Sequence, residues 1–175
     1  MAIIPAEILK HKRNPFIYNI LGIIEATNKN KDGAKKYFNL ALELDNYYLQ
    51  SLINLSNLSY IDKDFQSIIA LLKKYHSKYP DNDRVILTLA DLCFSAGLVR
   101  ETIYFHKKLI EIGKYQPKDL SALIFLLNYS DKYSDEEYKK YCKTYDEILI
   151  KNKINYNISN SEHDKCRIGF LSYDL

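Results

Sequence analysis

Residues 15–48 read PFIYNILGIIEATNKNKDGAKKYFNLALELDNYY, and this stretch decides the fold. Apolar side chains recur at helical spacing in both of its halves, and the polar segment NKNKD between them is typical of a turn. The sequence therefore predicts two packed helices, near 15–28 and 31–45, with Asp32 able to cap the second. The residues small enough to let the two helix backbones approach closely are Gly22, Ala34 and Ala41.

The same unit recurs at a constant spacing along the chain. Leu21-Gly22 is followed by Leu55-Ser56 and then by Leu89-Ala90, and the step from the first pair to the second equals the step from the second to the third. We call this step the repeat interval. The second-helix positions of Ala34, Phe38 and Ala41 recur as Ile68, Leu72 and Tyr75, and again as Thr102, His106 and Leu109. Three units in one register are therefore expected, and they span 15–48, 49–82 and 83–115.

This unit resembles the tetratricopeptide repeat (TPR), whose pattern is W-x₂-L-G-x₂-Y, then A-x₃-F, then a helix-ending proline. The matching residues are Leu21-Gly22, Ala34, Phe38 and Ala41, whereas Tyr18, Glu25 and Asn46 replace the Trp, the Tyr and the Pro of the pattern. Pro80 restores the proline in the second unit. The resemblance implies an all-α fold, a TPR α-solenoid in which helical hairpins form a right-handed superhelix.

By analogy with that family, first helices line a concave groove that holds a protein or peptide partner. The residues expected there are Phe16, Asn19, Ile23 and Ala26, then Gln50, Ile53, Asn57 and Tyr60, then Arg84, Leu87, Asp91 and Phe94. Asn54 joins them because it holds a slot where the family's repeats often carry an asparagine that grips the peptide backbone. Such a groove is amide-rich and partly apolar, which suits an extended peptide. The alternative is that Ile23, Ile53 and Leu87 belong to the interior and that the chain binds nothing tightly.

The segments outside the three units follow other patterns. They are an N-terminal cap helix over 1–14, connector helices over 116–150, a polar linker over 151–165, and a lone β-strand over 166–175. Residues 116–150 depart from the repeat interval. Pro117 begins the first connector helix, and Ser134 followed by Glu137 forms a capping box for the second. The strand would need a partner strand to satisfy its backbone groups.

The order of these last segments is similar to a junction in bacterial proteins related to protein O-GlcNAc transferase and to plant SPINDLY. The matching residues are Leu126-Leu127-Asn128-Tyr129, Ser134 and Glu136-Glu137 in the connector, and Arg167-Ile168-Gly169, Phe170, Ser172 and Asp174 in the strand that opens the catalytic domain. Cys166 and Leu175 depart from that pattern. The resemblance implies that the repeats recruit protein substrate for sugar transfer from UDP-GlcNAc by a catalytic domain missing from this sequence.

None of that family's catalytic or nucleotide-binding positions falls within these 175 residues. No residue is therefore assigned to catalysis, to a cofactor or to a metal, and we expect this chain alone to be inactive. The alternative function is a stand-alone TPR adaptor that binds a partner's peptide or helix. Deleting 166–175 would leave such an adaptor unchanged.

The composition of the chain limits which partners, cellular locations and cysteine-based sites are expected. Hydrophobic residues make up 47% and charged residues 27% of the chain, and the net charge of +3 gives no reason to expect a nucleic-acid partner. The sequence has no apolar run long enough for a membrane span and no signal peptide, so a cytoplasmic protein is expected. Cys93, Cys142 and Cys166 are too widely spaced for a disulfide framework or a zinc site.

Several short motifs imitate catalytic or metal sites. Ser161-Glu162-His163-Asp164 contains triad residue types, but neighbouring linker residues cannot form triad geometry. Asp62-Lys63-Asp64 and Asp81-Asn82-Asp83 resemble a metal-binding DxD but fall at repeat turns, where Asp caps helices. His106 takes an apolar position of the third unit, so we expect it to be a core or half-buried side chain.

Overall fold

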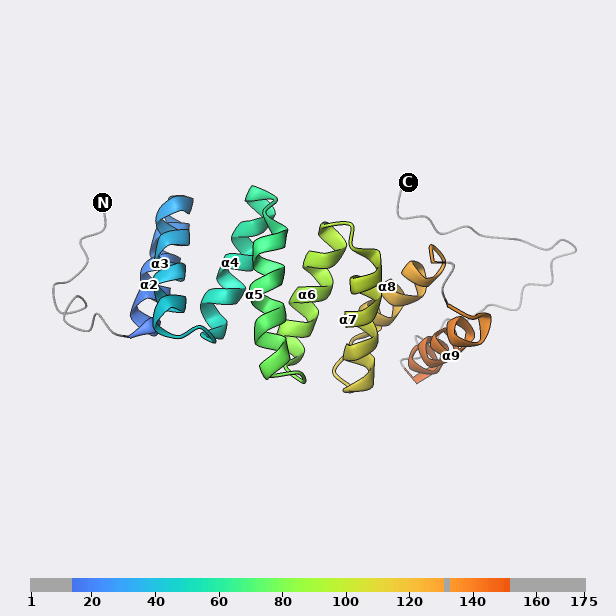
Figure 1. Ribbon diagram of the computed structural model, residues 1–175. Helices are drawn as coiled ribbons and strands as arrows, with labels where there is room; N and C mark the ends of the chain where they lie inside the picture. Colours follow the sequence, from blue (N-terminus) through green and yellow to red (C-terminus); the bar gives the residue numbers. More distant parts are fainter. Residues whose placement is uncertain (1–13, 131–132, 152–175) are drawn as a thin grey trace, which may run out of the picture.

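The computed structural model describes residues 14–130 and 133–151, and within them the chain is entirely helical apart from short turns (Figure 1). The described helices are α2 (Pro15–Thr27), α3 (Lys31–Leu44), α4 (Leu49–Asp62), α5 (Phe65–Lys78), α6 (Asp83–Ser95), α7 (Val99–Glu111), α8 (Pro117–Leu127) and α9 (Asp135–Lys151). The all-α prediction is confirmed over this range. The expected cap helix, most of the polar linker and the expected strand lie outside the described residues.

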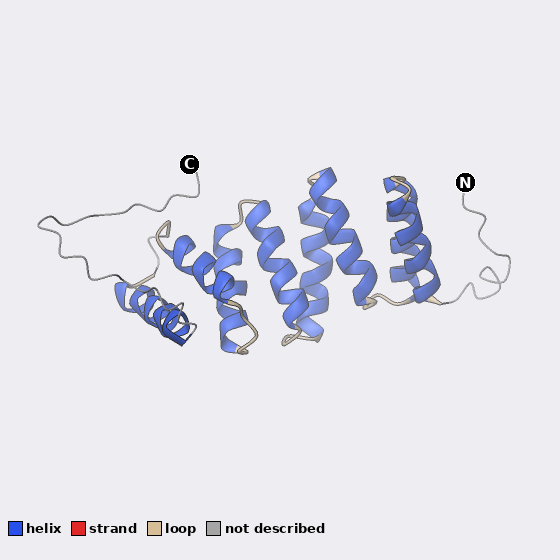
Figure 2. Ribbon diagram, turned by 180° about the vertical axis from the view of Figure 1, so that it is seen from behind, coloured by secondary structure: helices blue, strands red, loops and turns tan. Residues whose placement is uncertain are grey.

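The helices stand side by side in a single row, with α2 and α9 at opposite ends (Figures 1 and 2). Each helix packs against the next one in sequence, while α2 also touches α4 and α4 also touches α6. All of these contacts lie within one hairpin or between adjacent hairpins. This pattern is characteristic of a solenoid, in which each hairpin buries its apolar side against the hairpins beside it. The hairpins α2–α3, α4–α5 and α6–α7 fall within residues 15–48, 49–82 and 83–115, respectively.

The repeat interval is visible in the core. Leu21, Leu55 and Leu89 hold the same position in α2, α4 and α6, and all three are buried. One continuous hydrophobic cluster runs through the three units, and its largest fully buried members include Phe38, Leu52, Leu72, Ile86, Leu92 and Leu109. The recurring leucines are therefore the interior of the array, as the sequence predicts.

The close approach of α2 and α3 depends on small side chains. Ala34 and Ala41 have no exposed surface, and the Phe38 ring lies directly over Gly22. The predicted role of these residues in packing is confirmed. The structure corrects one detail, because α3 begins at Lys31 and the Asn30 side chain, rather than that of Asp32, caps it by accepting a 3.1 Å hydrogen bond from the Gly33 amide.

Two glycines stand just after the ends of helices α6 and α7. Gly97 follows α6 with φ of 72°, and Gly113 follows α7 with φ of 66°. This left-handed conformation is easy for glycine and costly for other residues. The first connector helix also begins at Pro117, as expected.

Helix α8 continues the interval that residues 116–150 were expected to break. Its buried side chains, Leu120, Leu123, Leu126 and Leu127, come one repeat interval after Ile86, Leu89, Leu92 and Cys93, which are buried in α6. Helix α8 therefore holds the first-helix position of a fourth hairpin. The departure from the interval begins later, because α9 begins at Asp135 and so starts further from the end of α8 at Leu127 than the second helices of the earlier hairpins start from their first helices.

Helix α9 closes the described part of the array. It buries Tyr141 and packs Tyr138, Tyr145 and Ile148 against the cluster formed by α8 and Ile103. Ser134 Oγ accepts a 3.3 Å hydrogen bond from the Glu137 amide, which is one half of the predicted capping box. The Glu137 carboxylate pairs with Lys107 of α7 and so ties α9 to the third unit.

Candidate protein-docking face

The helices α2, α4, α6 and α8 occupy equivalent positions, and we call the surface that their outer residues form the first-helix face. Direct contacts join these helices across the units. Asn54 of α4 donates to Asn19 of α2, and Arg84 of α6 lies 3.5 Å from the side-chain oxygen of Gln50 in α4. The face is therefore continuous from α2 to α6.

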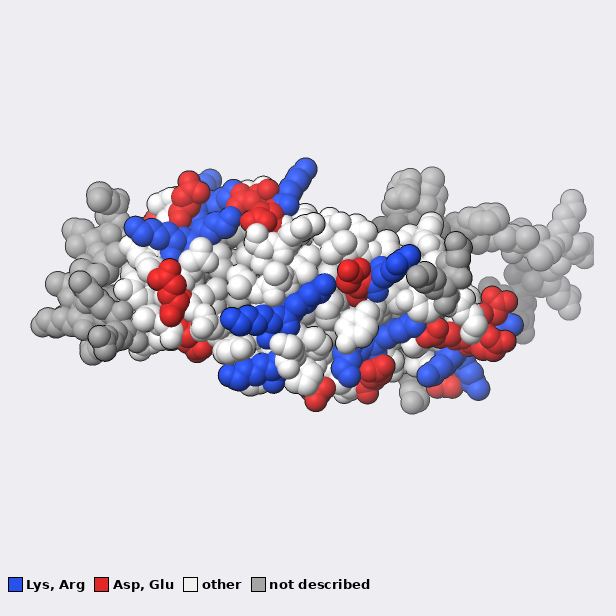
Figure 3. Space-filling view, viewed as in Figure 1, with Lys and Arg blue, Asp and Glu red and all other residues white. Residues whose placement is uncertain are grey.

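Large apolar side chains on this face remain open to solvent. Between 42% and 59% of the residue surface is exposed in Phe16 and Ile23 of α2, Tyr60 of α4, Phe94 of α6 and Phe125 of α8. Isolated exposed hydrophobics are ordinary, but a series on one face is a feature of interaction surfaces. By contrast, charges of both signs are interspersed along the side of the molecule seen in Figure 3.

The structure places the residues expected to line the groove in three environments. Those exposed to solvent are Phe16, Ile23, Ala26, Gln50, Asn57, Tyr60, Arg84, Asp91 and Phe94. Asn54 is half-buried, and Asn19 is buried. Of the residues for which an interior role was the alternative, Ile53 is buried, Leu87 is half-buried and Ile23 is exposed.

Asn19 is a buried connector between two units. Its side-chain oxygen accepts hydrogen bonds from Ser51 Oγ at 3.1 Å and from Asn54 Nδ2 at 2.9 Å. Both donors belong to α4, so one side chain of α2 serves two groups of the next hairpin. This use of Asn19 and Asn54 inside the fold reduces what either can offer to a peptide.

A first pocket lies between α2 and α4. It has a volume of about 340 Å³, and its lining consists of Ile23, Ala26, Thr27, Asn54, Asn57 and Leu58 with Phe38 from α3. The lining contains aliphatic, aromatic, hydroxyl and amide groups but no charged side chain. It therefore suits a neutral group.

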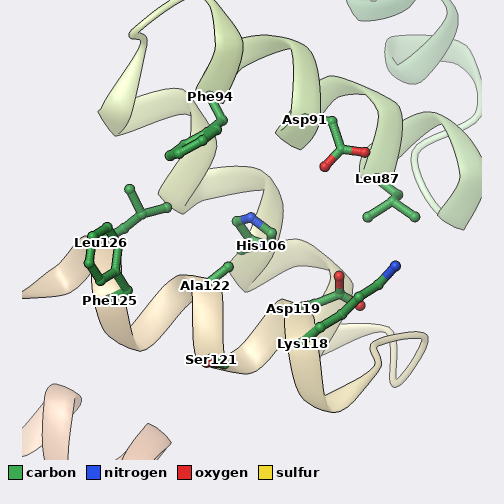
Figure 4. A pocket seen from close by; sticks show the side chains of 10 residues that line it. All are labelled: Leu87, Asp91, Phe94, His106, Lys118, Asp119, Ser121, Ala122, Phe125 and Leu126. Atoms are coloured by element: carbon green, nitrogen blue, oxygen red, sulfur yellow. The ribbon is translucent and has the colours of Figure 1, made fainter. Parts of the chain in front are cut away.

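A second and larger pocket lies between α6 and α8, with a volume of about 460 Å³ (Figure 4). Phe94 of α6 and Phe125 of α8 stand at one end of it, Asp91 and Asp119 lie toward the other end, and His106 of α7 lies between them. The remaining lining residues are Leu87 and Asp91 of α6, and Lys118, Asp119, Ser121, Ala122 and Leu126 of α8.

Sequence analysis missed the contribution of α8 to this pocket. The signal was present, because Lys118, Ser121 and Phe125 come one repeat interval after Arg84, Leu87 and Asp91. Extending the interval by one further unit would have placed them on the first-helix face.

Loss of contact with water changes the acidity of two groups at this second pocket, the buried His106 and Asp91, whose residue surface as a whole is exposed but whose carboxylate is partly desolvated. Desolvation raises the pKa of Asp91, with nearby Asp119 adding to the rise and Lys118 opposing it. Desolvation lowers the pKa of His106, opposed by Asp119. His106 is 5% exposed and its Nδ1 atom has no hydrogen-bond partner, so the predicted core position of this histidine is confirmed.

The described residues offer little for covalent or metal chemistry. Over 14–130 and 133–151 no three His, Cys, Asp or Glu side chains gather in a way that could hold a metal ion. Cys93 is buried, and desolvation raises the pKa of its thiol to about 11, which makes it a poor nucleophile. No helix in this part of the chain is both long enough and apolar enough to cross a bilayer.

Comparison with known proteins identifies the fold. No protein-family model and no curated protein sequence matches the chain. Among solved structures, MamA from Desulfovibrio magneticus RS-1 aligns at 15% identity over 80% of this chain and 78% of MamA, with a TM-score of 0.63. MamA is a TPR-type helical repeat protein. The chain has the fold of a TPR solenoid.

Two other TPR-type structures are similar to this one. PilF from Pseudomonas aeruginosa aligns at 16% identity over 82% of this chain and 63% of PilF, with a TM-score of 0.63. Yeast Tom70 aligns at 20% identity over 84% of this chain and 33% of Tom70, with a TM-score of 0.53. At such identities the similarity is one of fold alone. None of the three similarities bears on the glycosyltransferase resemblance of 116–175.

Proposed function

We propose that this TPR solenoid is a protein-docking module, which holds an extended segment of a partner protein along its first-helix face. The observation that carries the proposal is the series of exposed apolar side chains on α2, α4, α6 and α8, interrupted by two pockets. Burying those side chains under a partner is favourable because it removes apolar surface from water.

The polar residues of the same face explain why the partner segment would be extended. Gln50 and Asn57 are exposed on α4, and Arg84 and Asp91 are exposed at the equivalent positions of α6. Amide, guanidinium and carboxylate groups can satisfy the N–H and C=O groups of an extended peptide, which has no internal hydrogen bonds. The pockets then accept individual side chains of that peptide.

A random peptide library displayed on phage tests this function. Selected peptides should bind along the first-helix face, so Phe94→Ser should weaken their affinity by about tenfold or more, as expected for a residue at the centre of an interface. Tyr104 of α7 offers a matched control, because it is 55% exposed while Phe94 is 59% exposed. Peptides that lose affinity with Tyr104→Ser but not with Phe94→Ser would contradict the proposal.

We further propose that the module belongs to a glycosyltransferase similar to protein O-GlcNAc transferase, with UDP-GlcNAc as sugar donor. The support is the sequence resemblance across 116–175, of which the part beyond Lys151 lies outside the described residues. Sequencing the gene downstream of the Leu175 codon tests this proposal. A nucleotide-sugar-binding domain should follow, the longer protein should transfer GlcNAc, and the present chain alone should not.

A stand-alone adaptor is the competing proposal, and the TPR fold is equally compatible with it. An adaptor would keep its stability and its peptide affinity after deletion of 166–175, and its gene would contain no transferase domain downstream. We propose a cytoplasmic location in either case, because the free thiols Cys93 and Cys142 fit a reducing compartment. Cell fractionation checks the location.

A further inference from the structure

We propose that the pocket between α6 and α8 receives an arginine side chain of the partner segment. The inference rests on the docking function proposed above and specifies the chemistry of one of its contacts. It depends on three features of the pocket, which are two aromatic rings, two carboxylates and a buried histidine whose Nδ1 atom has no hydrogen-bond partner.

The aromatic rings provide a surface for a planar cation. Phe94 and Phe125 come from different helices, and both stand at the same end of the pocket with more than half of their surface exposed (Figure 4). Guanidinium groups stack on aromatic faces and are attracted by the ring electrons. Because the two rings are already open, a guanidinium group could reach them without displacing another side chain.

The carboxylates give the pocket a negative charge. Asp91 and Asp119 both line it, whereas Lys118 is the one lysine or arginine in its lining, so the formal charge of these three groups is −1. The Lys118 amine points away from the phenyl rings in Figure 4. A carboxylate and a guanidinium group can form two parallel hydrogen bonds, which makes this pair stronger and more selective than a neutral contact.

The histidine adds an unsatisfied polar group to the pocket. His106 is more than nine-tenths buried, its ring lines the pocket, and its Nδ1 atom has no hydrogen-bond partner. Desolvation lowers its pKa, so at neutral pH the ring is uncharged and does not repel a cation. Desolvation also raises the pKa of Asp91, because it disfavours the charged carboxylate, and an incoming cation would stabilise that carboxylate.

A purely apolar side chain fits this pocket less well. Leucine could contact Leu87, Ala122 and Leu126, but it would shield the Asp91 carboxylate from water and give it no hydrogen bond in return. Lysine would supply the charge without the flat shape that matches both the rings and a carboxylate. The α2–α4 pocket, whose lining carries no charge, has none of these features and serves as an internal comparison.

Capped heptapeptides of sequence Ac-Gly-Ser-Gly-X-Gly-Ser-Gly-NH2 test the proposal, with X as arginine, citrulline or leucine. Citrulline has the shape of arginine without its charge. In NMR titrations of the ¹⁵N-labelled chain, the arginine peptide should shift amide resonances of α8 and bind about tenfold more tightly than the citrulline peptide. Asp91→Asn should remove this preference, whereas Glu43→Gln, which neutralises an exposed carboxylate on α3, should preserve it.

A second variant separates the aromatic contribution from the charge. Phe125→Leu keeps an apolar side chain and removes the ring, so it should weaken the arginine peptide by about two- to fivefold, the range expected for a cation–π contact. Equal or tighter binding of the citrulline or leucine peptide would overturn the arginine proposal. The docking function would still stand if Phe94→Ser abolished binding of the selected library peptides.

A second copy of the chain is the remaining candidate occupant of the pocket. If a second copy of the chain covered this pocket, sedimentation would show a dimer that Phe125→Asp converts to a monomer, and the arginine proposal would be wrong. A monomer at all concentrations, combined with saturable binding of the arginine peptide at α8, supports it.

Discussion

The Phe38 ring of α3 lies against Gly22 of α2 so closely that a methyl group added at Gly22 would stand 2.5 Å from Cδ1 of Phe38. Real carbon atoms do not approach so closely without movement of a neighbour. Since Phe38 is buried in the main core cluster, the ring has little room to move aside.

We therefore expect Gly22→Leu to destabilise the fold by roughly 1–3 kcal/mol through overpacking. Gly22→Ala should also destabilise it, even though alanine favours a helix over glycine by about 1 kcal/mol at exposed positions. Urea unfolding followed by circular dichroism measures both. Ala26→Leu, at an exposed position one turn further along α2, is the control and should change stability little. An unaltered midpoint for Gly22→Leu would contradict the packing described here.

Asn19→Ala should cost about 1–3 kcal/mol, because it removes the acceptor used by Ser51 Oγ and Asn54 Nδ2 in a buried setting. Asn57→Ala deletes the same side chain at an exposed position of α4, and we expect a change within about 0.5 kcal/mol. Urea unfolding of the two variants gives the comparison. Equal effects would mean that the hydrogen bonds of Asn19 contribute nothing to stability.

The Lys107–Glu137 ion pair should hold α9 on the array. Both side chains are partly shielded from water, and Lys107 Nζ also lies 3.9 Å from the centre of the Tyr133 ring. Glu137→Gln should therefore lower stability by about 1 kcal/mol and speed amide exchange in α9 more than in α4. Glu111→Gln breaks the more exposed Lys108–Glu111 pair and should have a smaller effect. Hydrogen exchange read by mass spectrometry separates these outcomes.

Acidification should destabilise the fold through His106. Desolvation lowers the pKa of His106, and also that of His76, so the unfolded chain binds protons more readily than the folded one as the pH falls through about 6.5. The unfolding free energy should therefore fall between pH 7.5 and 5.5. His106→Gln should make that fall smaller, whatever it does to stability at pH 7.5. A slope unaffected by both His106→Gln and His76→Gln would show that neither histidine is desolvated.

The helical array could be predicted from the sequence because its cause is local and repeated. Each hairpin buries the same positions, so Leu21, Leu55 and Leu89 reveal the interval without knowledge of distant contacts. The fourth hairpin was harder to recognise. Its first helix keeps the buried positions, but α9 begins further along the chain than the repeat interval requires, so a pattern that needs both helices in register ends at residue 115.

The docking face could be predicted only in part. An exposed polar residue and a buried polar residue look alike in sequence, so Asn19 was expected on the surface although it lies between two hairpins. The α6–α8 pocket was missed for another reason. It needs Phe94, His106 and Phe125 from three helices, and the space between them depends on how α8 packs rather than on any motif.

The register that persists from α2 to α8 has a consequence for engineering. A second copy of 49–82, inserted after Asn82, would keep every later first helix at its present position within its own hairpin. The lengthened protein would present one more row of side chains to a longer ligand. The residues that line the two pockets would be unchanged, so the length of the first-helix face could be altered without altering the chemistry of its pockets.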